Sequence, residues 1–142
     1  MLMSFFFFNS DSDRSQLASL YRDQSMLSFE GGEFGGATNI VNKLRELPFK
    51  KVAHQVQTLD AQPSTPGSNG LVVLVTGTLI VDDEATPLKF SQSFHLVKDG
   101  STFFVLNDLF RLVYVSALFF IFNKYPYFLF IYCFDCNKNL KY

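Results

Sequence analysis

Three ionisable residues stand where the sequence pattern predicts apolar surroundings, and they are the first candidates for chemistry. Glu30 ends the apolar run MLSFE and directly precedes two glycines, whereas His54 and Asp108 lie in alternating segments on the side of apolar neighbours. An imidazole and a carboxylate in a pocket could exchange a proton near neutral pH. A structural role is the commoner one for both, since a buried carboxylate needs a hydrogen-bonded partner. For Asp108 that partner could be His54 or a backbone amide.

The charge balance and the cysteines argue against several other classes of function. Residues 1–112 carry nine Lys and Arg against twelve Asp and Glu, without a basic stripe, so nucleic acid is not an expected partner. Cys133 and Cys136 are the only cysteines in the sequence, too few for a disulfide framework, and a reducing compartment is expected. Their CFDC spacing supplies only half of a tetrahedral zinc site. We therefore expect no metal and no cofactor.

The first part of the sequence predicts two helices and a short strand. In SDSDRSQLASLY, the residues Leu17, Leu20 and Tyr21 recur at helical spacing after Ser and Asp residues that can cap a helix. A strand over MLSFE (26–30) follows. After GGEFGG, helical spacing returns until Pro48 stops it. The apolar positions of this second helix are Ile40, Val41, Leu44 and Leu47.

Beyond Phe49 the apolar period changes from helical to two, which predicts a sheet. The expected strands are VAHQVQT (52–58), LVVLVTGTLIV (71–81), FSQSFHLV (90–97) and TFFVLNDLFRL (102–112). Asp99-Gly100 predicts a hairpin turn, and Gly77 in the longest strand predicts a bulge or bend that curves the sheet. Helices followed by an antiparallel meander indicate an α+β fold. A curved sheet with helices on its concave face would enclose a cone-shaped pocket.

Five stretches resemble the nuclear transport factor 2 family, in the same order and nearly without gaps. They are DRSQLASLY, SMLSFEGGEFGGATNIVNKLRELPF, HQVQTLDAQPSTP, FSQSFHL and NDLFRL. The resemblance covers residues 11–112 and implies the family's cone, a curved antiparallel sheet with helices on its concave face. Residues 1–10 are then an atypical N-terminal segment, and residues 113–142 an aromatic-rich tail of unknown structure. Its longest charge-free run, residues 112–122, is shorter than the roughly 20 residues of a membrane span, so no membrane contact is expected.

The resemblance implies a carrier, because family members are homodimers that bind Ran in its GDP form and return it to the nucleus. An aromatic side chain of Ran enters the mouth of the cone, and acids around the mouth pair with basic neighbours of that side chain. The acids that match are Glu30, Asp82 and Glu84. The expected pocket lining is Phe29, Leu47, Phe49, Val52, His54, Leu79, Leu109 and Phe110. Contact with Phe-Gly repeat nucleoporins is also implied, with a location in the cytoplasm, the nucleus and the nuclear envelope at its pores.

Two features bear on how far the resemblance extends. Family members begin with a long amphipathic helix, whose place here is taken by MLMSFFFFN. Without that helix a strip of sheet and pocket wall would meet water, unless Phe5 to Phe8 or the tail covers it. The same cone fold also serves isomerases and dehydratases, with His54 and Asp108 as the acid/base pair, and dimerising scaffold domains. We expect a carrier and not an enzyme, since no oxyanion-type donor pair stands in an identifiable motif.

Overall fold

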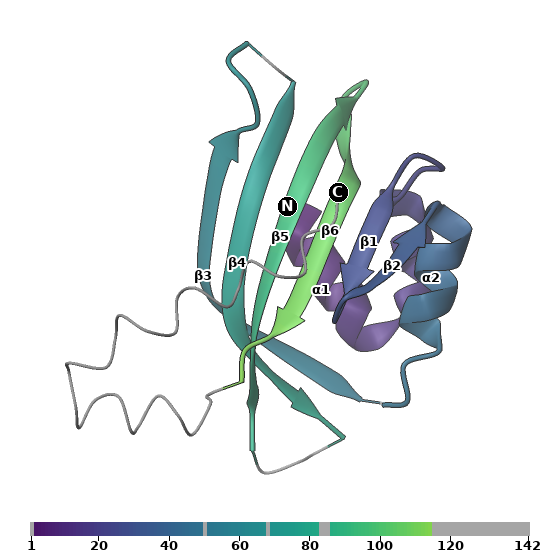
Figure 1. Ribbon diagram of the computed structural model, residues 1–142, viewed down its shortest axis with the longest axis vertical. Coiled ribbons are helices and arrows are strands. Elements are labelled where there is room, and N and C mark those ends of the chain that lie inside the picture. The colour runs from purple at the N-terminus through teal and green to yellow at the C-terminus, as the bar shows by residue number, and fades with distance from the viewer. Residues whose placement is uncertain (1, 50, 68, 83–85, 115–142) are drawn as a thin grey trace, which may run out of the picture.

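The computed structural model describes residues 2–49, 51–67, 69–82 and 86–114, which form a six-stranded sheet with helices on one face (Figure 1). Its strands are β1 (Met26–Phe29), β2 (Gly32–Gly35), β3 (Val52–Pro63), β4 (Gly70–Val81), β5 (Leu88–Asp99) and β6 (Thr102–Leu112). They lie in the order β2-β1-β6-β5-β4-β3, antiparallel except for β1 beside β6. The predicted α+β fold is confirmed. Glu84 and the tail from residue 115 onward, with its CFDC motif, lie outside the described residues.

The strands β1 and β2 form a tight hairpin that the sequence predicted only in part. The register pairs Phe29 with Gly32, so the turn consists of Glu30 and Gly31. Both turn residues have positive φ, 51° and 88°, as the favoured two-residue hairpin turns require. The strand β1 therefore ends at Phe29, one residue before the predicted end at Glu30. The strand β2, with the sequence GEFG, was not predicted because glycine has low β-propensity.

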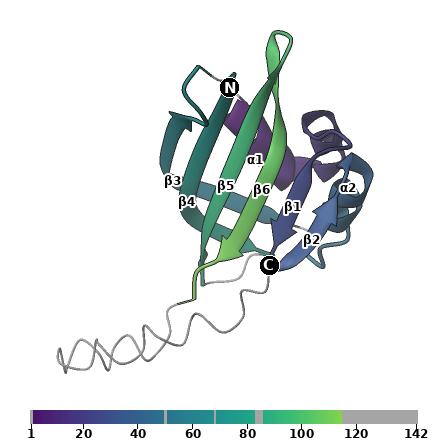
Figure 2. The same ribbon diagram turned by 45° about the horizontal axis from the view of Figure 1, so that its top comes forward.

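The bulge predicted at Gly77 of β4 lies instead in the neighbouring strand β3, opposite Gly77. The register between β3 and β4 shifts between Val56 and Thr58, which marks a bulge in β3. A Cβ on Gly77 would collide with the carbonyl oxygen of Gln55 and lie 2.9 Å from Cε1 of Phe90. The glycine thus lets the bulged strand approach closely, and the bulge adds local twist. Figure 2 shows the long strands curving in front of α1.

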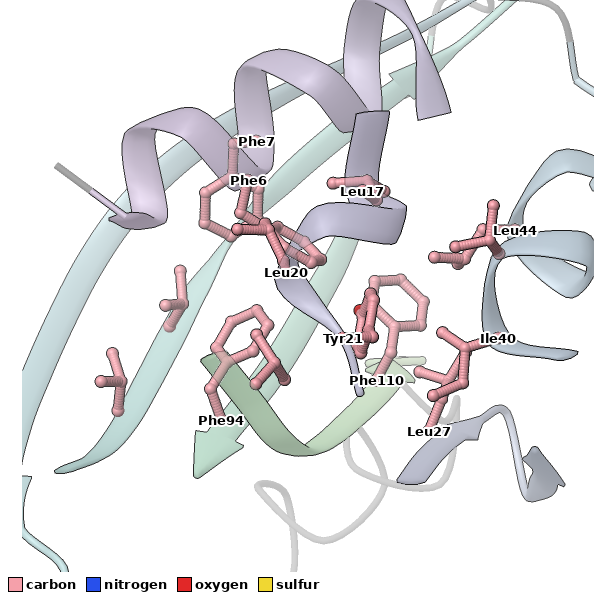
Figure 3. Packing of buried hydrophobic residues seen from close by; sticks show 14 of the residues in the cluster. Phe6, Phe7, Leu17, Leu20, Tyr21, Leu27, Ile40, Leu44, Phe94 and Phe110 are labelled. Carbon is pink, nitrogen blue, oxygen red and sulfur yellow. The ribbon is translucent and has the colours of Figure 1, made fainter. Parts of the chain in front are cut away.

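Helix α1 (Leu2–Ser12) covers the concave face in spite of its unusual sequence. Phe6 and Phe7 are buried, and the ring of Phe6 meets the ring of Phe94 on β5 edge to face, with centroids 4.9 Å apart. Figure 3 shows both side chains pointing from α1 toward the sheet. The boundary expected at residue 11 falls inside this helix, so the atypical segment is part of the packed structure.

The cover that α1 provides is incomplete at the β3 side of the sheet. Val56 and Leu59 pair with Gly77 and Val75 of β4, so they share the concave face with the fully buried Val75. Yet Val56 is 43% exposed and Leu59 is 49% exposed. Part of the concave face was expected to meet water. This is the case at Val56 and Leu59 on β3, whereas Val75 on the neighbouring strand is covered.

Two short helices complete the layer on the concave face. The segment predicted as an amphipathic α-helix is the 3-10 helix η1 (Arg14–Leu20), capped by Asp13, whose carboxylate accepts from the backbone N–H of Ser15 at 3.0 Å. Leu17 and Leu20 are both buried, because residues three apart share a face at about three residues per turn. Helix α2 (Ala37–Arg45) buries Ile40, Val41 and Leu44, as the spacing predicted.

Candidate functional site

An apolar cavity of about 130 Å³, partly open to solvent, lies between the concave face of the sheet and α1, η1 and α2. Seven of the eight expected lining residues form its wall, namely Phe29, Leu47, Phe49, Val52, His54, Leu79 and Phe110. Figure 3 shows Phe6, Leu17, Leu44 and Phe110, four of the wall residues, converging from three helices and the sheet. The polar side chains in the wall are Ser10, Arg14, His54 and Gln92.

Three rings of the cavity wall, Phe29, Phe110 and His54, are connected through Phe90, which is not itself a wall residue. Phe29 stacks on Phe110 with centroids 4.8 Å apart and planes 6° apart, and Phe110 stacks on Phe90 at 5.9 Å. The next ring is His54, which meets Phe90 edge to face at 5.4 Å. Such a row suits an aromatic guest, because rings favour offset-stacked and edge-to-face neighbours.

Leu109 does not line the cavity, and this expectation is wrong. Its side chain is 50% exposed, whereas its neighbours Asp108 and Phe110 are 1% and 7% exposed. Side chains alternate between the two faces of a strand, so Leu109 and Phe110 cannot both face inward. Leu109 lies on the outer face of the sheet.

Glu30 directly follows the wall residue Phe29 at the end of β1. Its backbone is tied to β6, with the N–H donating to the carbonyl of Phe110 at 3.2 Å. Its side chain folds toward the same strand, where Oε1 accepts from the backbone N–H of Leu112 at 2.6 Å. A charge-assisted hydrogen bond thus holds the carboxylate beside two wall residues, Phe29 and Leu112.

Asp82 holds a similar position at the end of β4, directly after the wall residue Val81. Its backbone N–H donates to the carbonyl of Lys51, and its Oδ1 accepts from the N–H of Lys51, each at 2.9 Å. Among the described residues, Glu30 and Asp82 are the two non-glycine residues with positive φ. Such backbone conformations cost roughly 1–3 kcal/mol and cluster at functional sites. Glu84, the third acid expected here, lies outside the described residues.

Arg14 is a wall residue that the sequence reasoning missed. Its guanidinium donates to the carbonyls of Leu44 and Phe49 at 3.2 and 3.5 Å and lies over the ring of Phe49, 5.2 Å from the centroid. Burial lowers the pKa of Arg14 from its ordinary value. Arg14 belongs to the DRSQLASLY stretch, but the carbonyls that it contacts lie 30 and 35 residues away in the sequence. No local sequence pattern predicts such contacts.

The two acid/base candidates do not contact each other. His54 pairs with Asp11 of α1, which accepts from the His54 backbone N–H at 3.0 Å and lies 2.5 Å from Nδ1. Asp108 accepts from the hydroxyl of Tyr21 and from Nε2 of Gln92, both at 2.7 Å. The sequence analysis expected Asp108 to pair with His54 or with a backbone amide, and this expectation is wrong.

Burial sets the protonation chemistry around Asp108. It raises the pKa of Asp108 to about 6, against the effect of the hydrogen bonds from Gln92 and Tyr21. Burial and the nearby Asp108 raise the pKa of Tyr21 well above its usual value. Within the described ranges no group of three His, Cys, Asp or Glu could hold a metal ion, and no helix has the length and apolarity to cross a membrane.

The curved sheet, the helices on its concave face and the cavity between them define the class of cone-shaped α+β proteins. Residues 2–112 match the nuclear transport factor 2 domain, and the chain belongs to the nuclear transport factor 2 family. It is 56% identical over 110 residues to nuclear transport factor 2 of Candida glabrata, covering 77% of this chain and 87% of that protein. The match includes the N-terminal residues that the sequence analysis set apart.

Solved structures agree with this assignment. The structure of nuclear transport factor 2 from Cryptosporidium parvum has a TM-score of 0.74 and 42% identity, with 79% of this chain and 89% of that chain covered. A putative scytalone dehydratase from Novosphingobium aromaticivorans has a TM-score of 0.67 at 14% identity, with 80% of each chain covered. At that identity the likeness concerns the fold alone.

Proposed function

We propose that this protein is a nuclear transport carrier that binds Ran-GDP by taking an aromatic side chain of Ran into the cavity. Glu30, Asp82 and Glu84 would pair with basic side chains that flank the inserted ring. Family membership and the relatives named nuclear transport factor 2 support the transport role. The observation that supports the binding mode is an apolar cavity with two acids, Glu30 and Asp82, that each directly follow a wall residue and have positive φ.

The cavity has a size suited to a single aromatic ring. Its volume is about 130 Å³, and a cavity of about 150 Å³ with a similar apolar wall in another protein holds benzene. Burying such a side chain contributes about 1.5–3 kcal/mol. An exposed ion pair at the rim adds about 0.2–1 kcal/mol, and a desolvated one several times more. Selectivity thus needs the ring and its basic flanks together.

We further propose that the protein forms a homodimer through the outer face of the sheet. Met26 of β1, Val72 and Leu74 of β4 and Leu109 of β6 lie on this face and are each at least 41% exposed. Large apolar residues gathered on one face favour association. From the same family relationship we propose that the protein binds Phe-Gly repeat nucleoporins. We also propose that it is located in the cytoplasm, in the nucleus and at nuclear pores.

A catalytic role is the weaker alternative for this cavity. Asp108 is fully enclosed and bonded to Tyr21 and Gln92, while His54 is paired with Asp11. Each group therefore has a structural partner, and the relatives are named as transport factors. We propose binding without turnover.

Calorimetry of the chain against Ran loaded with GDP or with GTP tests the carrier. We expect binding of the GDP form only, weakening with added salt because rim charges are screened over about 8–10 Å. Glu30→Gln keeps an acceptor for the N–H of Leu112 but removes the charge, and should weaken binding about tenfold, or about 1.4 kcal/mol. Glu30→Lys should abolish binding with an unchanged circular dichroism spectrum.

Glu33→Lys is the matched control, because Glu33 is an exposed acid on the neighbouring strand β2. It should bind Ran-GDP like the unmodified chain. Equal losses for Glu33→Lys and Glu30→Lys would show a general charge effect, and normal affinity of Glu30→Gln would refute the role assigned to the rim.

A further inference from the structure

We propose that the cavity also binds small phenols, with the ring against the apolar wall and the hydroxyl donating to Oε1 of Gln92. Gln92 lies on β5, is 4% exposed and forms part of the cavity wall. Its Nε2 donates to Oδ1 of Asp108 at 2.7 Å, but its Oε1 is buried and has no hydrogen-bond partner among the described residues. A buried acceptor without a donor is uncommon in folded proteins.

The hydrogen bonds around Gln92 fix which atom needs a partner. An ionised carboxylate only accepts hydrogen bonds, and Asp108 already accepts from Tyr21 on its other oxygen. Turning the amide of Gln92 would place Oε1 against that carboxylate and lose the bond from Nε2. The amide therefore keeps Nε2 on Asp108, and Oε1, on a residue of the cavity wall, is left without a donor.

The other wall groups indicate why the donor should be carried by an aromatic ring. Phe29 and Phe110 form a stacked pair in the cavity wall, and the volume of about 130 Å³ admits one ring. A water molecule would need two to four polar partners, whereas the hydroxyl of a phenol needs one and its ring contacts the apolar wall. A hydrocarbon of the same shape fills the space but leaves Oε1 unpaired.

Phenol and toluene are the probe pair, since they differ only in hydroxyl against methyl. Each is titrated into the isotopically labelled chain and followed by NMR shifts and by nuclear Overhauser contacts to the methyl groups of Val52 and Leu79. We expect phenol to bind about fivefold more tightly than toluene, as one net hydrogen bond allows. Gln92→Met should bring this ratio to one or below, because it keeps the shape but removes the acceptor and leaves the phenol hydroxyl unpaired.

The ratio of two ligands on one variant is insensitive to changes in its stability. Gln62→Met, at an exposed position of β3, is the matched control and should keep the fivefold ratio. Equal affinities on the unmodified chain, no binding of either probe at millimolar concentration, or a ratio that survives Gln92→Met would each overturn the proposal.

If Gln92→Met does not fold, a contact between phenol and the side-chain amide protons of Gln92 decides, and its absence refutes the site. Ran takes no part in these measurements. The phenol site and the carrier role can therefore fail independently.

Discussion

Replacing Asp108 by Asn should remove a component of the pH dependence of stability. Burial raises the pKa of Asp108 to about 6 in the folded protein, whereas an unfolded Asp has a pKa of about 3.9. The folded state thus binds this proton more tightly. The stability gained from protonation is fully present below about pH 3.9 and is lost as the pH rises through 6.

The size of the effect follows from these two pKa values. Relative to pH 7, protonation of Asp108 should add about 1 kcal/mol to the free energy of unfolding at pH 5 and about 2 kcal/mol at pH 4. Tyr21 stays neutral over this range, since its pKa is raised. Asn does not titrate. If the Gln92 amide turns, the Asn amide can donate to Oε1 of Gln92 while the Asn oxygen accepts from Tyr21, and Nε2 replaces Oε1 as the unpaired atom of Gln92. At pH 7 we therefore expect Asp108→Asn to be at least as stable as the unmodified chain.

Urea unfolding of both proteins between pH 4 and pH 7 measures the effect. The advantage of the Asn variant should shrink by about 2 kcal/mol toward pH 4, because other titrating groups cancel in the difference. Asp60→Asn, on the exposed part of β3, is the matched control for removing a carboxylate. If the difference for Asp108→Asn also stays constant within about 0.5 kcal/mol, the buried carboxylate does not titrate near 6 and the reasoning fails.

Two further substitutions probe the packing and the outer face. Phe6→Ala should lower the free energy of unfolding by about 3–5 kcal/mol in urea titrations, because Phe6 is 3% exposed, whereas Phe8→Ala, 69% exposed, should change it by less than about 0.5 kcal/mol. Equal losses would show that α1 is not docked as described. Leu109→Asp should shift sedimentation from dimer to monomer, and Asn42→Asp, at an exposed position of α2, should not. A monomeric unmodified chain would refute the dimer.

Patterns within single elements were sufficient to predict most of the fold. Alternation placed Phe90, Phe94 and Leu96 on one face, and these residues are 1%, 0% and 4% exposed. Helical spacing located α2 and selected its three buried residues, Ile40, Val41 and Leu44, whereas the fourth selected residue, Leu47, lies beyond the end of the helix. Each of these features depends on neighbours two to four positions away, which a sequence displays directly.

Features that depend on distant contacts could not be predicted in this way. The partners of Asp108 lie 87 and 16 residues away, and Arg14 meets carbonyls 30 and 35 residues away. The strand β2 was missed because its pairing with β1 overrides the low β-propensity of glycine. The cover of the sheet was left open between Phe5 to Phe8 and the tail, because the contact of Phe6 with Phe94 joins residues 88 positions apart.

The backbone at Glu30 links the fold to the proposed function. Its turn requires positive φ at both central residues, and glycine or asparagine would adopt it more cheaply than glutamate. The hydrogen bond from the N–H of Leu112 at 2.6 Å, about 1.5–3 kcal/mol for a charged acceptor, offsets a conformational cost of about 1–3 kcal/mol. A glutamate here is thus close to neutral for stability, and the turn alone does not call for it. What it adds is a carboxylate held beside the wall of an apolar cavity, which is the feature that the proposed capture of a ring flanked by basic side chains requires.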